Sequence, residues 1–453
     1  MDKSAFKKLG LSMILPLLIL LVQPLGMDLR QSTVVSALLM VIIWWSTGIV
    51  KSIPASLFLL AVFCLVSAAP LTTVFTFPLS ENFFLITLTY LFSQGIANSG
   101  LVDKLFEPVL LRFSNTPIKT LFAIIVMYTI TIYMIPQPLA RLIIVAMLFH
   151  RFLYKTTASE ETKSVLMFAC FIFYAVVNMA TKNADIIMNN ASVAFAGLDI
   201  TDGQWITYMA VPVILYGALI LVLFCLLFRK HLLGIKLTIA EHKGEKSKLS
   251  LNKNEKRTLA VIILTVILWM TGSIHGINAT IITLCSALVF FALKVLCKKD
   301  FKAIDVTTLI FLTAAFSIGG VMKACGAADI VFSRLQVLFP KEYSPLYLII
   351  MILVGMLMHL ILGSNTTTLS VVIPGLTVIC GNVLPPEIIM FVAFNSVAFH
   401  SILPFHSAAI MIGTSNGYFP AKYVARLGIP VTLLIFISTL FIFVPWWKFL
   451  GLM

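Results

Sequence analysis

The sequence predicts an all-α polytopic membrane protein with about eleven transmembrane helices and two re-entrant hairpins, arranged as two inverted repeats. The first observation is composition: of 453 residues, 60% are hydrophobic and 11% are charged, whereas soluble domains carry about 25% charged residues. The second is a series of apolar segments with about the 20 residues that a helical span requires. The third is a set of motifs that recurs in the second half of the chain, each copy containing a pair of shorter apolar arms.

The apolar segments give the order of the elements. Full spans are expected over residues 11–26, 32–50, 54–69, 84–98, 163–180, 204–228, 258–271, 279–296, 306–322, 386–403 and 424–447. Short arms are expected at 117–134 with 139–152, and at 344–363 with 367–382. Each pair meets at helix-breaking residues, so each is predicted to form a hairpin inside the protein. The first segment lacks the cleavage site of a signal peptide, and we expect it to remain as a span.

The net charge of +14 comes from basic residues between the spans, which indicates positive-inside topology rather than nucleic-acid binding. With the N-terminus in the cytoplasm and the hairpins not crossing, most basic residues fall on the cytoplasmic side. The exceptions are Arg30, Lys323, Arg334, Lys341 and Lys448 outside, with Arg141 and Lys182 at membrane depth. This asymmetry predicts a multi-pass protein of the cell membrane, by default a bacterial inner membrane, embedded in the lipid bilayer.

The two halves share motifs at a near-constant spacing. Leu85-Ile86, Leu88-Thr89, Phe92-Ser93 and Gly95 recur 224 residues later, and Phe168, Phe171, Ala175, Ile187-Met188 and Ser192 recur 223 residues later. We expect a first repeat over 84–228, with an inward-opening hairpin at 117–152, and a second over 306–453, with an outward-opening hairpin at 344–382. A charged cytoplasmic loop at 229–257 joins them. Such repeats with broken helices are typical of secondary transporters, which bind substrate at the repeat interface.

The tip of the second hairpin carries Gly363, Ser364, Asn365, Thr366 and Thr367. Ser and Asn are residue types that cap helix N-termini after a glycine break. A helix that begins there directs N–H groups and partial positive charge at the centre of the membrane, which suits an anion. Carbonyl groups of the arriving arm suit a cation such as Na⁺. We predict a binding site here; the alternative is that these residues only cap two half-helices.

Ser364-Asn365-Thr366 resembles the Ser-Asn-Thr signature of the divalent anion/sodium symporter family of the ion transporter superfamily. Residues 37–54, ALLMVIIWWSTGIVKSIP, are similar to that family's second helix, and 198–215, LDITDGQWITYMAVPVIL, resemble the start of its sixth. The resemblance covers nearly the whole chain. It implies a homodimeric elevator transporter of dicarboxylates, tricarboxylates or sulfate, with 1–83 and 258–305 mainly in the scaffold and both hairpin tips holding anion and Na⁺.

The first hairpin departs from that family. Ser114-Asn115-Thr116 lies 250 residues before the second signature and precedes Pro117, which favours a helix cap at the cytoplasmic surface. The repeat instead predicts the first tip at Pro136-Gln137-Pro138. The resemblance implies that this tip helps to bind the first Na⁺ and one end of the anion, and here only Gln137 offers a side-chain amide.

Arg141 lies one turn past that tip, with no acidic residue within eighteen positions on either side. A buried, unpaired guanidinium is costly, so it is expected to face a partner or a wet cavity. One hypothesis is that Arg141, with Lys182, replaces the charge of the first Na⁺ and holds a substrate carboxylate. The other is that it bonds to hairpin carbonyls and Asp185 and never meets substrate.

The turns that face the tips supply the remaining candidates. Lys182 and Asp185 have the spacing of an ion pair if the first turn is helical, and the matching turn carries Pro404, His406 and Ser407. The resemblance implies a second Na⁺ site built on Gly363, Asn365, Pro404 and Ser407, with Lys182, Asp185 and His406 as accessory residues. The substrate-binding candidates are Gln137, Arg141, Ser364, Asn365, Thr366 and Thr367. His359 and His400 are expected to be core residues rather than proton carriers.

These observations predict a secondary active transporter of small dicarboxylate or tricarboxylate anions, either coupled to Na⁺ or, with Arg141 at the altered first tip, an anion exchanger. A sulfate or other inorganic anion transporter is the transport alternative, and an anion-binding membrane sensor is the non-transport alternative. A cation/proton antiporter would require buried aspartate pairs, which the sequence lacks. No enzymatic motif is found, and neither a cofactor nor a metal other than Na⁺ as coupling ion is expected.

Overall fold

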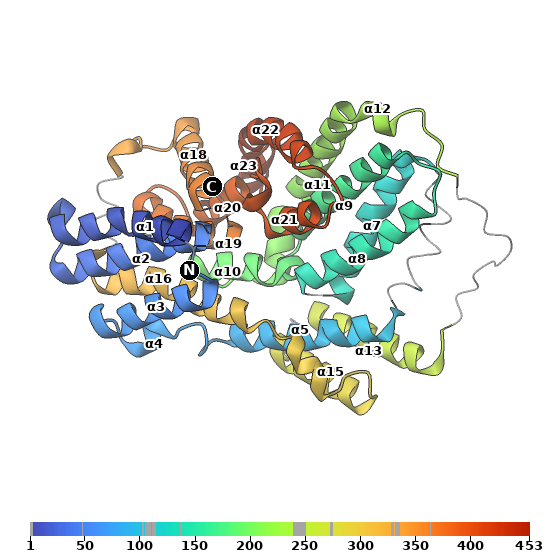
Figure 1. Cartoon of the computed structure of the whole chain (residues 1–453), viewed down its shortest axis with the longest axis horizontal. Helices are drawn as coiled ribbons and strands as arrows, with labels where there is room; N and C mark the ends of the chain where they lie inside the picture. Colours follow the sequence, from blue (N-terminus) through green and yellow to red (C-terminus); the bar gives the residue numbers. More distant parts are fainter. Residues whose placement is uncertain are drawn as a thin grey trace.

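The computed structural model describes residues 3–47, 49–101, 104, 110, 115–135, 137–238, 251–271, 275–327, 330, 336–362 and 364–453, and its regular elements there are helices (Figure 1). In the first half these are α1 (Lys3–Val22), α2 (Leu29–Thr47), α3 (Ser52–Val66), α4 (Leu71–Val74), α5 (Glu81–Ser99), α7 (Pro117–Met134), α8 (Pro138–Tyr154), α9 (Glu160–Asn178), η2 (Lys182–Asp185), α10 (Met188–Phe195), α11 (Asp202–Leu227) and α12 (Arg229–Leu232). In the second half they are α13 (Lys253–Met270), α15 (Ala279–Ala292), η3 (Lys298–Ala303), α16 (Val306–Ala324), α18 (Pro345–Leu362), α19 (Asn365–Cys380), α20 (Pro386–Ala398), η5 (Pro404–His406), α21 (Ala408–Ser415), α22 (Ala421–Ser438), η6 (Thr439–Phe443) and α23 (Val444–Phe449).

Within the described ranges, four helices are long and apolar enough to cross a membrane: Pro117–Met134, Asp202–Leu227, Val306–Ala324 and Ala421–Phe449. Shorter apolar helices accompany them, and they include the arms of the second hairpin. α11 shows how such a helix is placed: Trp205 is buried against the protein, whereas Ile214 and Leu226 are 67% and 65% exposed. Outward-facing apolar side chains of this size suit lipid rather than water. These helices agree with the multi-pass membrane protein that the sequence predicts.

The order of the helices repeats along the chain. The elements α2, α3, α5, α7, α8, α9, α10 and α11 are followed by α13, α15, α16, α18, α19, α20, α21 and α22. The packing is reciprocal, because α5 lies against α15 of the second repeat and α16 lies against α3 of the first. Reciprocal contacts of this kind are what a two-fold relation between two copies produces. The likeness in helix order extends upstream of the predicted repeat bounds, to α2 in the first half and α13 in the second.

Each repeat contains a helix that is interrupted and then resumes. α9 ends at Asn178 and leads through η2 into the short α10, and α20 leads in the same way through η5 into α21. The sequence predicts the breaks but not the two short helices. With eight residues each, they are below the length at which an apolar segment gives a distinct periodic signal.

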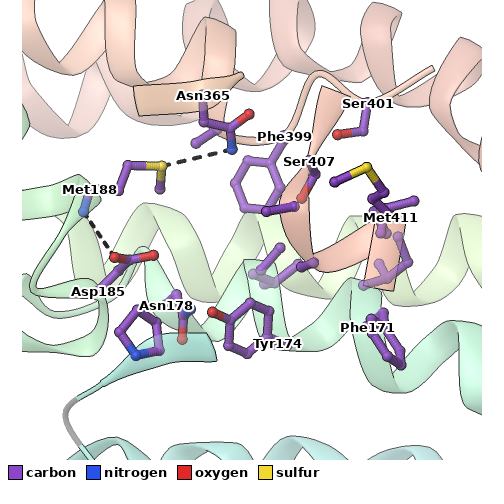
Figure 2. A pocket seen from close by; sticks show the side chains of 18 of the residues that line it. Phe171, Tyr174, Asn178, Asp185, Met188, Asn365, Phe399, Ser401, Ser407 and Met411 are labelled. Atoms are coloured by element: carbon purple, nitrogen blue, oxygen red, sulfur yellow. Dashed lines mark hydrogen bonds between the residues drawn. The ribbon is translucent and has the colours of Figure 1, made fainter. Parts of the chain in front are cut away.

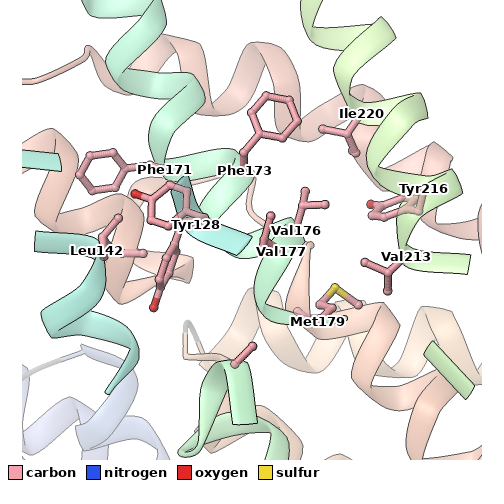
Figure 3. Close-up of a cluster of buried hydrophobic side chains, with 14 of the residues drawn as sticks. Tyr128, Leu142, Phe171, Phe173, Val176, Val177, Met179, Val213, Tyr216 and Ile220 are labelled. Carbon is pink, nitrogen blue, oxygen red and sulfur yellow. The ribbon is translucent and has the colours of Figure 1, made fainter. Parts of the chain in front are cut away.

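The first hairpin is fixed to the rest of the protein through the face of α9. Tyr128 of α7 and Leu142 of α8 lie on one side of this helix, and Val213 and Tyr216 of α11 lie on the other (Figure 3). The indole N–H of Trp205 also donates to the backbone oxygen of Met179 at 3.0 Å, just past the end of α9. Both hairpin arms and α11 therefore share the apolar core that surrounds α9.

Candidate functional site

The first hairpin turns between α7 and α8, and its tip is stabilised by a side-chain cap. The side-chain oxygen of Gln137 accepts the N–H of Ala140, while Pro138 takes the first helical position. The N–H of Gln137 donates to Ser93 Oγ at 3.2 Å, which ties the tip to α5. At the opposite end of α7, Thr116 caps the helix N-terminus. The prediction that Thr116 is a helix cap is confirmed.

The second hairpin turns at Ser364, which caps α19. Its hydroxyl lies 3.5 Å from the N–H of Thr367 and 3.1 Å from the hydroxyl of the same residue. Thr368 bonds back to the carbonyl of Ser364 at 2.7 Å. Asn365 is different, because its Oδ1 is buried and has no hydrogen-bond partner among the described residues. The tip thus offers an unused acceptor in addition to the N-terminus of the helix.

The turns η2 and η5 lead into two further helix N-termini. The N–H of Met188, the first residue of α10, donates to Asp185 Oδ1 at 2.9 Å. The N-cap residue of α21, Ser407, makes no capping hydrogen bond with its side chain. α10 packs directly on α19, so the turn of the first repeat meets the hairpin tip of the second.

A cavity of about 580 Å³ lies where these four N-termini converge (Figure 2). Its wall includes the opening residues of α8, α10, α19 and α21, which are Pro138, Met188, Asn365 and Ala408. Its polar lining consists of Trp45, Tyr174, Asn178, Asp185, Ser364, Asn365, Thr366, Ser401 and Ser407. The rest is apolar and includes Phe171, Phe399 and Met411. No lysine, arginine or histidine is among the described lining residues, so positive potential comes from helix N-termini rather than from side chains at the surface of the cavity.

The cavity brings together some of the predicted site residues. Ser364, Asn365, Thr366, Ser407 and Asp185 line it. Six others do not: Gln137, Arg141, Lys182, Thr367, Pro404 and His406. Gly363 lies outside the described residues. Tyr174, Asn178 and Ser401 also line the cavity and were not predicted, although Asn178 and Ser401 each stand at a helix break that the apolar pattern indicates.

Arg141 is completely buried behind the first tip. Its guanidinium donates to the carbonyl oxygen of Ile135 at 2.7 Å, to Asn178 Oδ1 at 2.6 Å and to the carbonyl oxygen of Ala184. The carbon of the guanidinium lies 5.9 Å from the centre of the Tyr174 ring. The hydrogen bond to Ile135 is the contact with a hairpin carbonyl that the second hypothesis for Arg141 expects. The hydrogen bond to Asp185 that the same hypothesis expects is not among the described contacts of Arg141.

A family model described as the transmembrane region of sodium:sulfate symporters matches residues 3–453. The chain belongs to the sodium:sulfate symporter family. Members of this family are secondary active anion transporters, so the predicted membership and the transport of an anion across a membrane are both confirmed at that level. A search of the curated proteins found no match.

The expected ion pair between Lys182 and Asp185 does not form in this protein. Lys182 Nζ donates to the carbonyl oxygen of Ile200 at 2.6 Å, and the carboxylate of Asp185 caps α10. The prediction was wrong because each side chain has a backbone partner instead: the carbonyl oxygen of Ile200 accepts from Lys182, and the N–H of Met188 donates to Asp185. Asp185 is thereby left facing the cavity.

Three histidines gather behind the second tip. The rings of His359, His400 and His406 have centroids 5.2–6.1 Å apart, and all three side chains are buried. His359 Nε2 lies 3.0 Å from the carbonyl oxygen of His406, which joins α18 to η5. As the sequence predicts, His359 and His400 are core residues. The contact among the three could not be foreseen, because His359 lies more than forty positions from the other two.

Proposed function

We propose that this protein carries small dicarboxylate or tricarboxylate anions by an elevator mechanism. The observation that carries the proposal is the convergence of four helix N-termini, those of α8, α10, α19 and α21, on one cavity. Helix N-termini bind anions because their N–H groups and partial positive charges point outward. Paired by the repeat, they supply positive potential to more than one side of the cavity, as a substrate with separated negative charges requires.

The walls of the cavity favour an organic anion. Phe171, Phe399 and Met411 place apolar surface between the polar groups (Figure 2), and this surface suits the carbon chain of a dicarboxylate. Sulfate is compact and hydrated on all sides, so a site for it would need donors throughout. The volume of about 580 Å³ lies within the roughly 300–1,000 Å³ typical of small-molecule sites. The family description names sulfate, which makes sulfate the second candidate.

The coupling ion has fewer supporting groups. Asn365 Oδ1, the hydroxyl of Ser407 and the carboxylate of Asp185 are oxygens that suit Na⁺, and the first two belong to the predicted second Na⁺ site. Transport is therefore either coupled to Na⁺ at the second tip or proceeds by exchange of anions. We also propose a homodimer, on the ground of the family resemblance. The N-terminus is placed in the cytoplasm on the ground of the asymmetric distribution of basic residues.

Uptake of labelled succinate, citrate and sulfate into proteoliposomes tests the proposal. Each anion is offered with and without a Na⁺ gradient, and with and without internal unlabelled anion. Saturable uptake of succinate or citrate, with sulfate ineffective as a competitor, is the expected result. Uptake of sulfate alone would contradict the carboxylate assignment, and anion binding without flux would indicate a sensor.

A further inference from the structure

Arg141 is held by three oxygen atoms that come from three separate segments. Ile135 belongs to the tip of the first hairpin, Asn178 ends α9, and Ala184 lies in η2. The oxygens are two backbone carbonyls and one side-chain amide, all at places where the helix is interrupted. Freed carbonyl oxygens of broken helices are the groups with which transporters coordinate a small cation. The guanidinium thus occupies a site with the chemistry of an ion site.

The equivalent position in the second repeat has no charge. Arg141 is the fourth residue of α8, and the fourth residue of α19 is Thr368. The hydroxyl of Thr368 donates to the carbonyl of Ser364 at 2.7 Å and stays within its own helix. Asn365 Oδ1 is left without a partner among the described residues at that tip. The two hairpin tips therefore differ in their acceptor oxygens. A cationic side chain binds those near the first tip, and Asn365 Oδ1 remains available at the second.

Asp185 explains why a positive charge is needed at the first site. Its carboxylate lines the cavity and caps α10, and it interacts electrostatically with Arg141 behind it. A carboxylate alone at that position would repel an incoming dianion through a poorly screened region. A fixed guanidinium offsets this charge, as a bound cation would.

We propose that the guanidinium of Arg141 is a built-in cation that permanently occupies the first ion site, so that no Na⁺ binds there during transport. This inference rests on the proposed function and concerns the same cavity. A Na⁺ ion at the first tip would need the three oxygens that Arg141 already holds. Any effect of Na⁺ on anion binding then arises at the second tip, and the positive charge at the first tip remains in the protein after the anion leaves.

Removal of the side chain leaves the three oxygens for an added cation, and this is the test. Arg141→Ala is purified in detergent, and its melting temperature is measured in choline chloride, NaCl and low-millimolar guanidinium chloride. Guanidinium is expected to raise the melting temperature of this variant relative to choline and to leave wild type unchanged. Na⁺ is expected to raise it by more in this variant than in wild type, where only the second tip can bind Na⁺. Arg151→Ala removes an exposed arginine from the other end of α8 and is the matched control, which is expected to respond to each cation as wild type does.

Transport gives the second readout. In Na⁺-free medium, wild type is expected to exchange anion, while Arg141→Ala is slower by on the order of a hundredfold and recovers with added guanidinium or Na⁺. If the alanine variant does not fold, the pair Arg141→Lys and Arg141→Gln replaces it, and only the glutamine variant should then require Na⁺. A folded Arg141→Ala that responds to no cation, or neutral variants with wild-type Na⁺-free exchange, would overturn the inference. Wild type without any anion flux would contradict the proposed function instead, because the melting measurement does not depend on flux.

Discussion

The side-chain amide of Asn365 lies against the thioether of Met188, with Nδ2 and Sδ 3.8 Å apart, although 177 positions separate the two residues in the sequence (Figure 2). Each begins a helix: Asn365 opens α19 at the second hairpin tip, and Met188 opens α10 after the first broken helix. The contact joins the repeats at one wall of the cavity.

Replacing Asn365 by alanine removes the one polar side chain of the second tip that has an unpartnered, buried acceptor. Because this oxygen can coordinate Na⁺, we expect Asn365→Ala to weaken anion binding in the presence of Na⁺ by about ten- to a hundredfold, taking the interaction at the roughly 1.5–3 kcal/mol of a hydrogen bond to a charged group. Equilibrium binding of labelled anion measures this. Asn115→Ala is the matched control, because Asn115 is the middle residue of the other Ser-Asn-Thr sequence and does not line the cavity. Equal losses in both variants would count against the second tip as the site.

Replacing Asp185 by asparagine removes a negative charge from the cavity and keeps an oxygen that can cap α10. We expect several-fold tighter binding of a dianion, because Coulomb repulsion between the carboxylate and the substrate is lost. The effect should be smaller for a monoanion, which serves as the internal control. Weaker dianion binding, together with loss of Na⁺ dependence, would instead identify Asp185 as a ligand of the coupling ion.

Gly428 of α22 fixes the position of Ser401 at the wall of the cavity. A Cβ atom at residue 428 would lie 2.1 Å from the carbonyl oxygen of Ser401 and 3.0 Å from Cα of Ile402. Both obstacles are backbone, so Gly428→Ala is expected to cost about 1–3 kcal/mol and to reduce transport. Gly203→Ala in the first turn of α11 meets no atom within 4 Å and should leave the melting temperature the same or higher. Equal melting temperatures for both variants would contradict the close approach of α22.

Lys104 and Glu255 form an ion pair outside the membrane-spanning segments, with Nζ 2.7 and 2.8 Å from the carboxylate oxygens. The hydrogen bond from Lys104, with that from the N–H of Asn252, lowers the pKa of Glu255 from its ordinary value of 4.5. A lowered folded-state pKa adds stability above the unfolded-state value, and this stability is lost as the pH falls through the folded-state pKa. Melting curves from neutral pH to acid should therefore show a step that Glu255→Gln lacks. Glu342→Gln, on an exposed segment, should retain the step.

Local chemistry was sufficient to locate the second hairpin tip. Ser364 and the residues after it have cap chemistry that acts within four positions, so the sequence contains all of the interaction. Gln137 at the first tip was located by the repeat, but its role as a cap could not be separated from a role in binding. The burial of Arg141 was also predictable, because its neighbours are apolar. Its partners Asn178 and Ala184, which lie 37 and 43 positions away, were not.

The residues that the sequence analysis misplaced depend on tertiary contacts. Lys182 finds its partner at Ile200, after α10, rather than at Asp185 three positions away. Tyr174 lines the cavity from the middle of an apolar helix, where nothing in the sequence distinguishes it from its core neighbours. The short helices α10 and α21 owe their stability to packing against α19 and α9, since isolated helices of eight residues do not form in water. Such elements become visible only when the neighbouring segments are in place.

The reciprocal packing of α5 on α15 and of α16 on α3 has a consequence for how the protein is made. During synthesis the first half enters the membrane before α15 and α16 exist, so α5 and α3 must wait in the bilayer without the helices that complete them. Each half lacks part of its helix packing until the other is present, because α15 packs on α5 and α16 packs on α3. Two polypeptides separated between α12 and α13 therefore have the information to find one another in a membrane, as two subunits would.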